Sequence, residues 1–193
     1  MKCKFIWILA IGISGIGTAQ VKLEREFRIR KDQFPESALA AMEPYLVGAR
    51  QLRFYREIDS GRTSVEMKFK LRRLRYSIEF TPAGTLEDVE ITIGRVDIPG
   101  ASLGAILDHL NGKFGNYRIR KIQQQYPRTG FESDSEALRA AFQNLILPVI
   151  RYELVIRTRG KTGIEQYEVL YGSDGAFLNF RIALPPNYDH VLY

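Results

Sequence analysis

The stretch Phe34-Pro35-Glu36-Ser37-Ala38-Leu39-Ala40-Ala41-Met42 has a second copy in this chain, Ile98-Pro99-Gly100-Ala101-Ser102-Leu103-Gly104-Ala105-Ile106. The offset of 64 residues between Pro35 and Pro99 also pairs Gly48 with Gly112, the glycines that follow the two apolar patterns. A proline at the start, apolar residues at helical spacing and a closing glycine indicate an amphipathic helix with one face to bury. The sequence therefore predicts two related units, each opening with a helix.

Both units continue with segments in which apolar and polar residues alternate, as they do in strands with one buried face. In each unit the last two segments flank a glycine, Gly84 in the first and Gly175 in the second. Glycine reaches positive φ without steric cost, so this pattern favours a hairpin turn. The predicted strands are residues 52–56, 65–71, 76–80 and 89–93, then 117–121, 151–158, 167–171 and 180–184.

The second unit carries an insert, residues 127–148, between its first two strands. Ser133-Asp134-Ser135-Glu136 supplies helix-start residues before an apolar helical pattern from Ala137 to Leu147, which predicts one additional helix. We therefore expect an α+β fold, a tandem repeat of a helix plus a four-stranded antiparallel sheet, with the extra helix in the second repeat. A helix would cover one face of each sheet and leave the other open.

The first residues have the features of an export signal. Lys2 and Lys4 precede an apolar run, and Gly17-Thr18-Ala19 places small residues at the signal-peptidase positions, which predicts cleavage after Ala19. A membrane anchor is the alternative, but the run is shorter than the roughly 20 apolar residues that span a bilayer. The expected organisation is a signal peptide at 1–19, a first repeat at 20–95 and a second repeat at 96–193. The mature protein would be periplasmic or secreted.

The composition bounds the kinds of partner. The chain has 28 Lys and Arg against 22 Asp and Glu, a formal charge of +6 that falls to +4 without Lys2 and Lys4. A modest basic balance favours acidic partners, and an export signal argues against nucleic acid. Cys3 precedes the apolar run, so the mature chain has no cysteine for a disulfide, a thiolate nucleophile or a metal site.

The order of helix, strand and glycine hairpin, written twice behind a signal peptide, resembles the PepSY-like exported proteins of Bacteroidetes with a β-lactamase-inhibitor-protein-like (BLIP-like) fold. The resemblance covers roughly Phe27 to Leu184. The turn Ser173-Asp174-Gly175 fits the Asp-rich turn of that family, whereas Thr81-Pro82-Ala83-Gly84 does not. The resemblance implies a periplasmic or surface binding module, in some relatives tied to inhibition of an enzyme. It transfers no catalytic residue.

No reactive pattern stands out in the sequence. His109 and His190 lack metal-ligand spacing, and the chain has no phosphate-binding glycine loop or nucleophile elbow. Carboxylate pairs such as Glu87 and Asp88 are expected on polar turns, not on the two sides of one cleft. We therefore expect no catalytic residue, no metal and no cofactor.

Basic residues interleaved with aromatic and aliphatic ones are the best candidates for a site. Alternation alone places lysine and arginine on a solvent face, where they protect a sheet from aggregation. A functional interpretation adds that Arg and Tyr are enriched in protein interfaces. The expected partner-binding residues on the open face are Arg53, Tyr55, Arg73, Arg75, Arg118 and Arg120.

These observations favour a non-enzymatic module that presents an open basic sheet face to a macromolecule, as an inhibitor or modulator of a protein partner in the cell envelope. A second hypothesis is an envelope protein that binds anionic lipid or glycan through the same arginines. A third is an enzyme with an unrecognised carboxylate pair. Salt dependence separates the second hypothesis from the first, because screening weakens exposed charge contacts.

Overall fold

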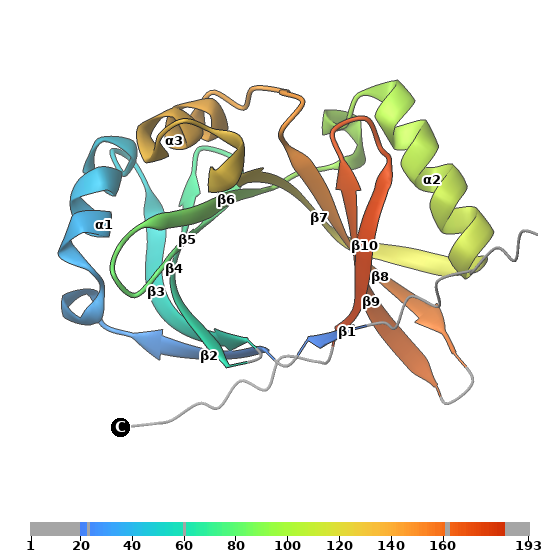
Figure 1. The fold of residues 1–193 in the computed structure, drawn as a ribbon, viewed down its shortest axis with the longest axis horizontal. Coiled ribbons are helices and arrows are strands. Elements are labelled where there is room, and N and C mark those ends of the chain that lie inside the picture. The colour runs from blue at the N-terminus through green and yellow to red at the C-terminus, as the bar shows by residue number, and fades with distance from the viewer. Residues whose placement is uncertain (1–19, 23, 60, 161–162, 184–193) are drawn as a thin grey trace, which may run out of the picture.

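The computed structural model describes residues 20–22, 24–59, 61–160 and 163–183 (Figure 1). The predicted signal peptide at residues 1–19 and His190 in the C-terminal tail lie outside the described residues. The predicted boundaries at residues 95 and 96 stay predictions.

Ten strands form one sheet in the order β1-β10-β9-β8-β7-β6-β5-β4-β3-β2. The strands are β1 (Gln20–Lys22), β2 (Glu24–Ile29), β3 (Arg50–Asp59), β4 (Arg62–Leu71), β5 (Leu74–Phe80), β6 (Leu86–Thr92), β7 (Tyr117–Pro127), β8 (Arg151–Arg159), β9 (Ile164–Gly172) and β10 (Phe177–Ala183). The helices are α1 (Glu36–Met42), α2 (Gly100–Phe114) and α3 (Asp134–Phe142), with short 3-10 turns at Lys31–Gln33, Glu43–Tyr45, Arg95–Asp97 and Arg128–Gly130.

The predicted α+β class is confirmed, but the expectation of two separate four-stranded sheets is wrong. Strands β6 and β7 pair antiparallel from Asp88 opposite Pro127 to Thr92 opposite Gln123, so the sheet is continuous. Strand β7 runs on to Pro127, beyond the predicted end at residue 121, and this extra length reaches β6. From α1 to β6 and from α2 to β10 the chain forms a helix and four strands, with α3 between β7 and β8.

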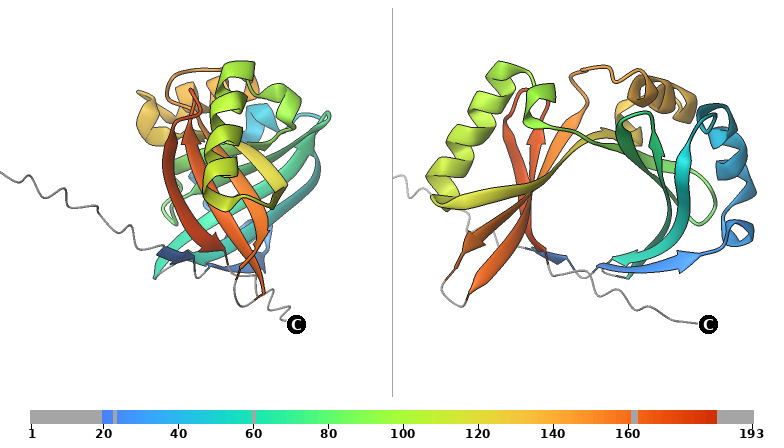
Figure 2. Two further views of the ribbon diagram at one scale, coloured as in Figure 1. Left: turned by 90° about the vertical axis from the view of Figure 1, so that its right-hand side faces the viewer. Right: turned by 180° about the vertical axis from the view of Figure 1, so that it is seen from behind.

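The N-terminal strands join the two ends of the sheet. Strand β1 pairs parallel with β10, and β2, one residue further along the chain, pairs antiparallel with β3. Arg181 Nη1 on β10 also lies 3.3 Å from Asp59 Oδ2 on β3. The sheet therefore curls into a ring whose inner face is lined by one set of strand side chains (Figures 1 and 2).

The three helices of the described residues pack on the outside of this ring (Figure 1). Helix α1 ends earlier than the predicted Gly48, because Pro44 lacks the N–H needed to continue an α-helix and the chain passes into a 3-10 turn. Helix α3 starts where its sequence indicates, since the Ser133 hydroxyl accepts a hydrogen bond from the Glu136 N–H. It ends at Phe142, before the predicted Leu147, and Asn144 adopts a positive φ of 52°.

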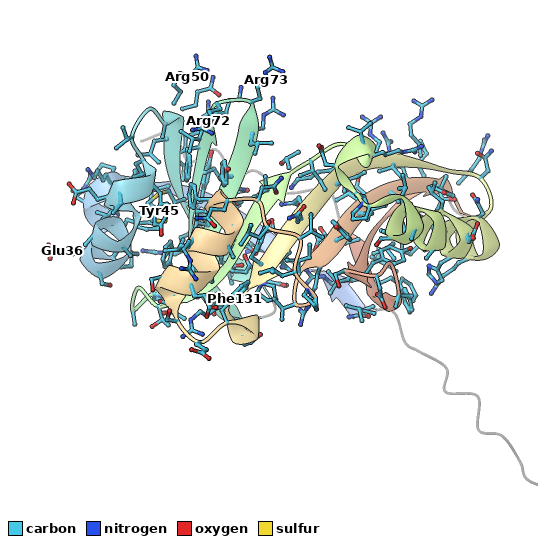
Figure 3. All side chains as sticks on the ribbon, turned by 90° about the horizontal axis from the view of Figure 1, so that it is seen from above. Glu36, Tyr45, Arg50, Arg72, Arg73 and Phe131 are labelled. Carbon is cyan, nitrogen blue, oxygen red and sulfur yellow. The ribbon has the colours of Figure 1, made fainter. Side chains whose placement is uncertain are left out.

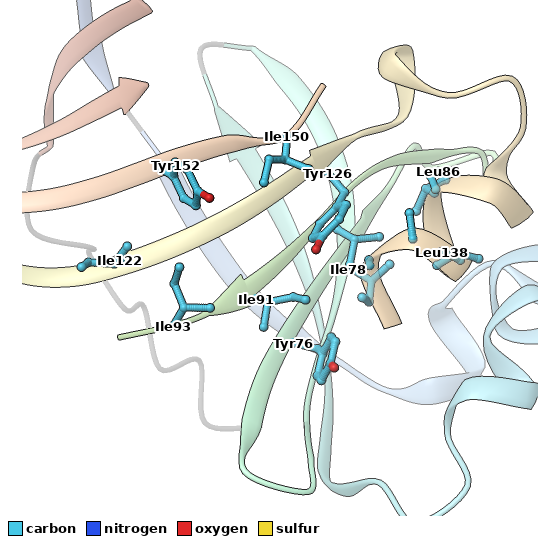
Figure 4. Close-up of a cluster of buried hydrophobic side chains, with 14 of the residues drawn as sticks. Tyr76, Ile78, Leu86, Ile91, Ile93, Ile122, Tyr126, Leu138, Ile150 and Tyr152 are labelled. Carbon is cyan, nitrogen blue, oxygen red and sulfur yellow. The ribbon is translucent and has the colours of Figure 1, made fainter. Parts of the chain in front are cut away.

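The core lies between the helices and the outer side of the sheet. Figure 4 shows its centre, where Leu138 of α3 lies near Leu86 and Ile78, with Tyr126 and Ile91 from neighbouring strands. Residues in these strands alternate between the two faces apart from a register shift between β5 and β6, so most side chains between the core residues point into the ring. Burial of one set of strand side chains under the helices therefore determines which charged residues of the same strands line the inner face.

Candidate functional site

A groove with a volume of about 710 Å³ lies on the inner face, where β3, β4 and β5 meet the junction of β6 and β7. Lysines and arginines supply all of its charged side chains, and no carboxylate lines it. We call it the basic groove, and its cations are Arg53, Lys68, Lys70, Arg75, Arg95, Arg120 and Lys121. Seven cations in a lining that holds no Asp or Glu create a positive field that attracts anions.

Four of the six predicted site residues line the basic groove, namely Arg53, Tyr55, Arg75 and Arg120. Arg120 sits where the β7–β8 register shifts between Ile119 and Lys121. The Lys68 ammonium lies 5.0 Å from the centre of the Tyr55 ring, which adds a cation–π contact. Their part in binding stays a prediction.

The other two predicted residues do not line this groove. Arg73 lies in the β4–β5 turn, at the same end of the molecule as Arg50 and Arg72 (Figure 3). Arg118 lies near the start of β7, in register with Arg157 of β8. Both side chains are exposed.

Sequence reasoning missed the remaining cations of the groove. Lys68 and Lys70 could have been found, because they share the strand parity of Arg53 once the hairpin register is known. Arg95 could not have been predicted from the sequence, because it lies in a 3-10 turn, where no alternating pattern indicates the face to which a side chain points.

The charge of the inner face changes sign beyond the basic groove. Glu66, Glu79 and Asp88 are direct register neighbours on β4, β5 and β6, and we call them the acidic row. They line a second cavity of about 720 Å³, whose lining holds ten Asp and Glu against six Lys and Arg. Like charges directly opposite each other on neighbouring strands destabilise a sheet. The open face is therefore basic at one end only, and the prediction of a basic face is incomplete.

Lys68 stands at the boundary between the two ends. Its ammonium lies 2.9 Å from Glu26 Oε1 and 2.8 Å from Glu66 Oε2. Burial alone would lower the pKa of Lys68, but the two carboxylates raise it above its usual value. The side chain therefore carries its charge at every physiological pH.

Two carboxyl groups of the acidic end have perturbed acidity. Burial, reinforced by Glu79, raises the pKa of Asp88, although Gln125 Nε2 donates a hydrogen bond to it at 2.8 Å. Burial, reinforced by Glu153, also raises the pKa of Glu90, which accepts a hydrogen bond from Gln123. In both cases the environment opposes the charged form.

We expect the double variant Asp88→Asn, Glu90→Gln to be more stable than the native chain at pH 7.5, by about 1 kcal/mol, because like charges leave the inner face. Above about pH 4 these two carboxyl groups are deprotonated in the unfolded chain but still protonated in the native fold, because their native pKa values are raised. The free energy of unfolding of the native chain therefore falls as the pH rises from about 4 towards these raised pKa values. Urea unfolding at pH 4.5 and 7.5 measures both quantities. An equally steep loss of stability in the variant would contradict the assignment, since Glu66, Glu79, Glu153 and Lys121 remain in place.

Within the part of the chain that the structure describes, no three or more His, Cys, Asp or Glu side chains are grouped to hold a metal ion. Among the same residues, no helix has the length and apolarity to span a bilayer. His109 lies on α2 with Nδ1 2.9 Å from the Tyr171 hydroxyl, which is a packing contact on the outer side of the sheet.

The protein is an α+β protein with an antiparallel sheet that is covered on its outer face by helices. Neither a protein-family model nor a curated protein sequence matches the chain. Its fold is similar to that of a DUF2874 family protein from Bacteroides ovatus, with a TM-score of 0.52 and 12% identity over 83% of this chain and 94% of that one. A proposed periplasmic protein from Bacteroides eggerthii has a TM-score of 0.50 and 11% identity over 81% and 93%.

A BLIP-like protein from Bacteroides fragilis is also similar, with a TM-score of 0.49 and 10% identity over 83% of this chain and 92% of that one. The resemblance to exported proteins of Bacteroides, predicted from the repeated pattern, is confirmed as a likeness of fold. At these identities the likeness is one of fold.

Proposed function

We propose that the chain is a non-catalytic module of the periplasm or the secreted fraction that binds an acidic segment of a protein partner in the cell envelope. The observation that carries this proposal is the basic groove, a cavity of about 710 Å³ with seven Lys and Arg and no Asp or Glu in its lining. Tyr55 and Tyr76 also line it, and tyrosine with arginine is typical of protein interfaces.

An exported location is supported by the predicted signal peptide and by the fold shared with a proposed periplasmic protein. A binding role is favoured over catalysis because the two carboxyl groups with raised pKa values, Asp88 and Glu90, do not line the basic groove. The inhibitory or modulating role implied by the sequence resemblance remains part of the proposal.

The curvature of the sheet argues against a lipid bilayer as the ligand and leaves a glycan as the alternative. The groove lies on the inner side of a sheet whose ends meet at Arg181 and Asp59, so a flat bilayer surface would not reach it. A polyanionic glycan chain is thin enough to enter and is the competing ligand of the test.

The test uses residues 20–193 and a fluorescent peptide with six glutamates spaced by glycine and serine. Changing Arg53, Arg75 and Arg120 to serine should weaken peptide binding by tenfold or more, because three cations leave one cavity. The matched control changes Arg56, Arg139 and Arg159, exposed arginines that do not line the groove, to serine.

Equal weakening in both variants would show a general charge effect and contradict the proposal. A heparin fragment that binds the groove more tightly than the peptide at 150 mM salt would favour the glycan hypothesis instead. A peptide that binds neither the native chain nor any variant would remove the proposed function.

A further inference from the structure

The inner face carries an ordered reversal of charge along neighbouring strands. Strand β4 presents Lys70, Lys68 and then Glu66, and β5 presents Arg75, then a serine, then Glu79. Strand β3 follows the same order from Arg53 to its acidic end at Glu57 and Asp59. Because β4 and β5 are antiparallel, the acidic residue comes before the basic ones along β4 and after the basic one along β5. The two opposite sequence orders place residues of the same charge side by side in the sheet.

The register turns these separate strand patterns into two bands across the sheet. Lys70 lies opposite Arg75 in one band, and Glu66, Glu79 and Asp88 form the acidic row in the other. Four residues separate Lys70 from Glu66 on β4, which is about 14 Å at the rise of a strand. A ligand that follows the strands therefore meets both signs of charge within a few residues.

The curvature of the sheet limits what can follow this path. Strands β1 and β2 join β10 to β3, and Arg181 contacts Asp59 across the same junction. A globular surface cannot lie flat on an inner face of this curvature, whereas an extended chain can run along it.

We infer that the inner face holds one extended protein segment in which a block of acidic residues is followed by a block of basic residues. This inference rests on the proposed function and specifies its partner. The acidic block lies in the basic groove, and the basic block lies over the acidic row. A segment that is acidic throughout would meet repulsion from Glu66, Glu79 and Asp88, so the acidic row selects against it.

The test compares three labelled peptides of equal length on residues 20–193. The block peptide has four glutamates, Gly-Ser and four lysines. The truncated-charge peptide has glutamine in place of the lysines, and the alternating peptide has the composition of the block peptide with glutamate and lysine in turn. We expect the block peptide to bind at least tenfold more tightly than the truncated-charge peptide and fivefold more tightly than the alternating one.

A variant with Glu79→Gln and Asp88→Asn locates the second half of the site. We expect it to reduce the advantage of the block peptide to less than twofold, without weakening the truncated-charge peptide. Circular dichroism and urea unfolding establish that the variant retains its fold.

The outcomes separate the two proposals. If the block peptide has no advantage on the native chain, while the truncated-charge peptide still depends on Arg53, Arg75 and Arg120, this inference is wrong and the proposed function stands. If neither peptide binds the native chain, both proposals fail.

Discussion

Replacing Gly175 with alanine should lower the free energy of unfolding by about 3 kcal/mol, the combined effect of a strained turn and an overpacked contact. Gly175 has a φ of +85°, a conformation that alanine adopts only with strain. A Cβ at this position would lie 2.4 Å from the carbonyl oxygen of Ser102 and 3.0 Å from the Cβ of Ala105. Both neighbours belong to α2, whose backbone would have to move away from the hairpin. Urea unfolding at pH 7 measures the loss.

The chain offers two matched controls for this substitution. Gly84 has a similar φ of +87°, and its added Cβ would meet the Ser37 hydroxyl, which can rotate away, and the Pro35 Cβ at 3.1 Å, which needs only a small shift. Gly84→Ala should therefore cost only about 1 to 2 kcal/mol. Gly104 lies inside α2 with nothing within 4 Å of an added Cβ, so Gly104→Ala should stabilise by about 0.5 to 1 kcal/mol. A Gly175→Ala variant as stable as the native chain would mean that α2 moves freely on the sheet.

The paired glycines also show how far the sequence could predict the fold. Alternating residues around Gly84 and Gly175 predicted both hairpins and a strand at residues 76–80 with one buried face, on which Tyr76, Ile78 and Phe80 are buried. These predictions succeed because they depend on residues close together in the chain. The pairing of β6 with β7 depends on sheet register across 31 residues or more, and nothing local specifies it.

The site was only partly predictable for the same reason. Parity alone placed Arg53 and Arg75 on the open face, and the structure brings both to the basic groove. Whether Glu66 stands beside Glu79 or one pair further along depends on the exact hairpin register, which a pattern of alternation does not specify. The acidic row and the ring closure through β1 were therefore missed.

Lys68 links the stability of the fold to the charge reversal on its inner face. The side chains of Glu26 and Glu66 are only 8% and 10% exposed, and both contact its ammonium. Removing one partner of a buried ion pair costs about 3 to 5 kcal/mol, because the remaining charge loses its compensation. The Lys68 side chain is 38% exposed, so solvent screens the interaction, and we expect Lys68→Met to lower the free energy of unfolding by about 2 kcal/mol.

The control for Lys68→Met is Lys70→Met, two residues along the same face. Within the described residues no ion pair is found for Lys70, so its loss should change the unfolding free energy by less than about 0.5 kcal/mol. The double variant Lys68→Met, Glu66→Gln should regain part of the lost stability, because it removes a carboxylate that has lost its cation. If Lys68→Met and Lys70→Met lower the free energy of unfolding by the same amount, the ion pairs of Lys68 do not stabilise the fold. If only Lys68→Met is costly and Glu66→Gln relieves it, Lys68 is the ion that allows basic and acidic bands to adjoin on one sheet.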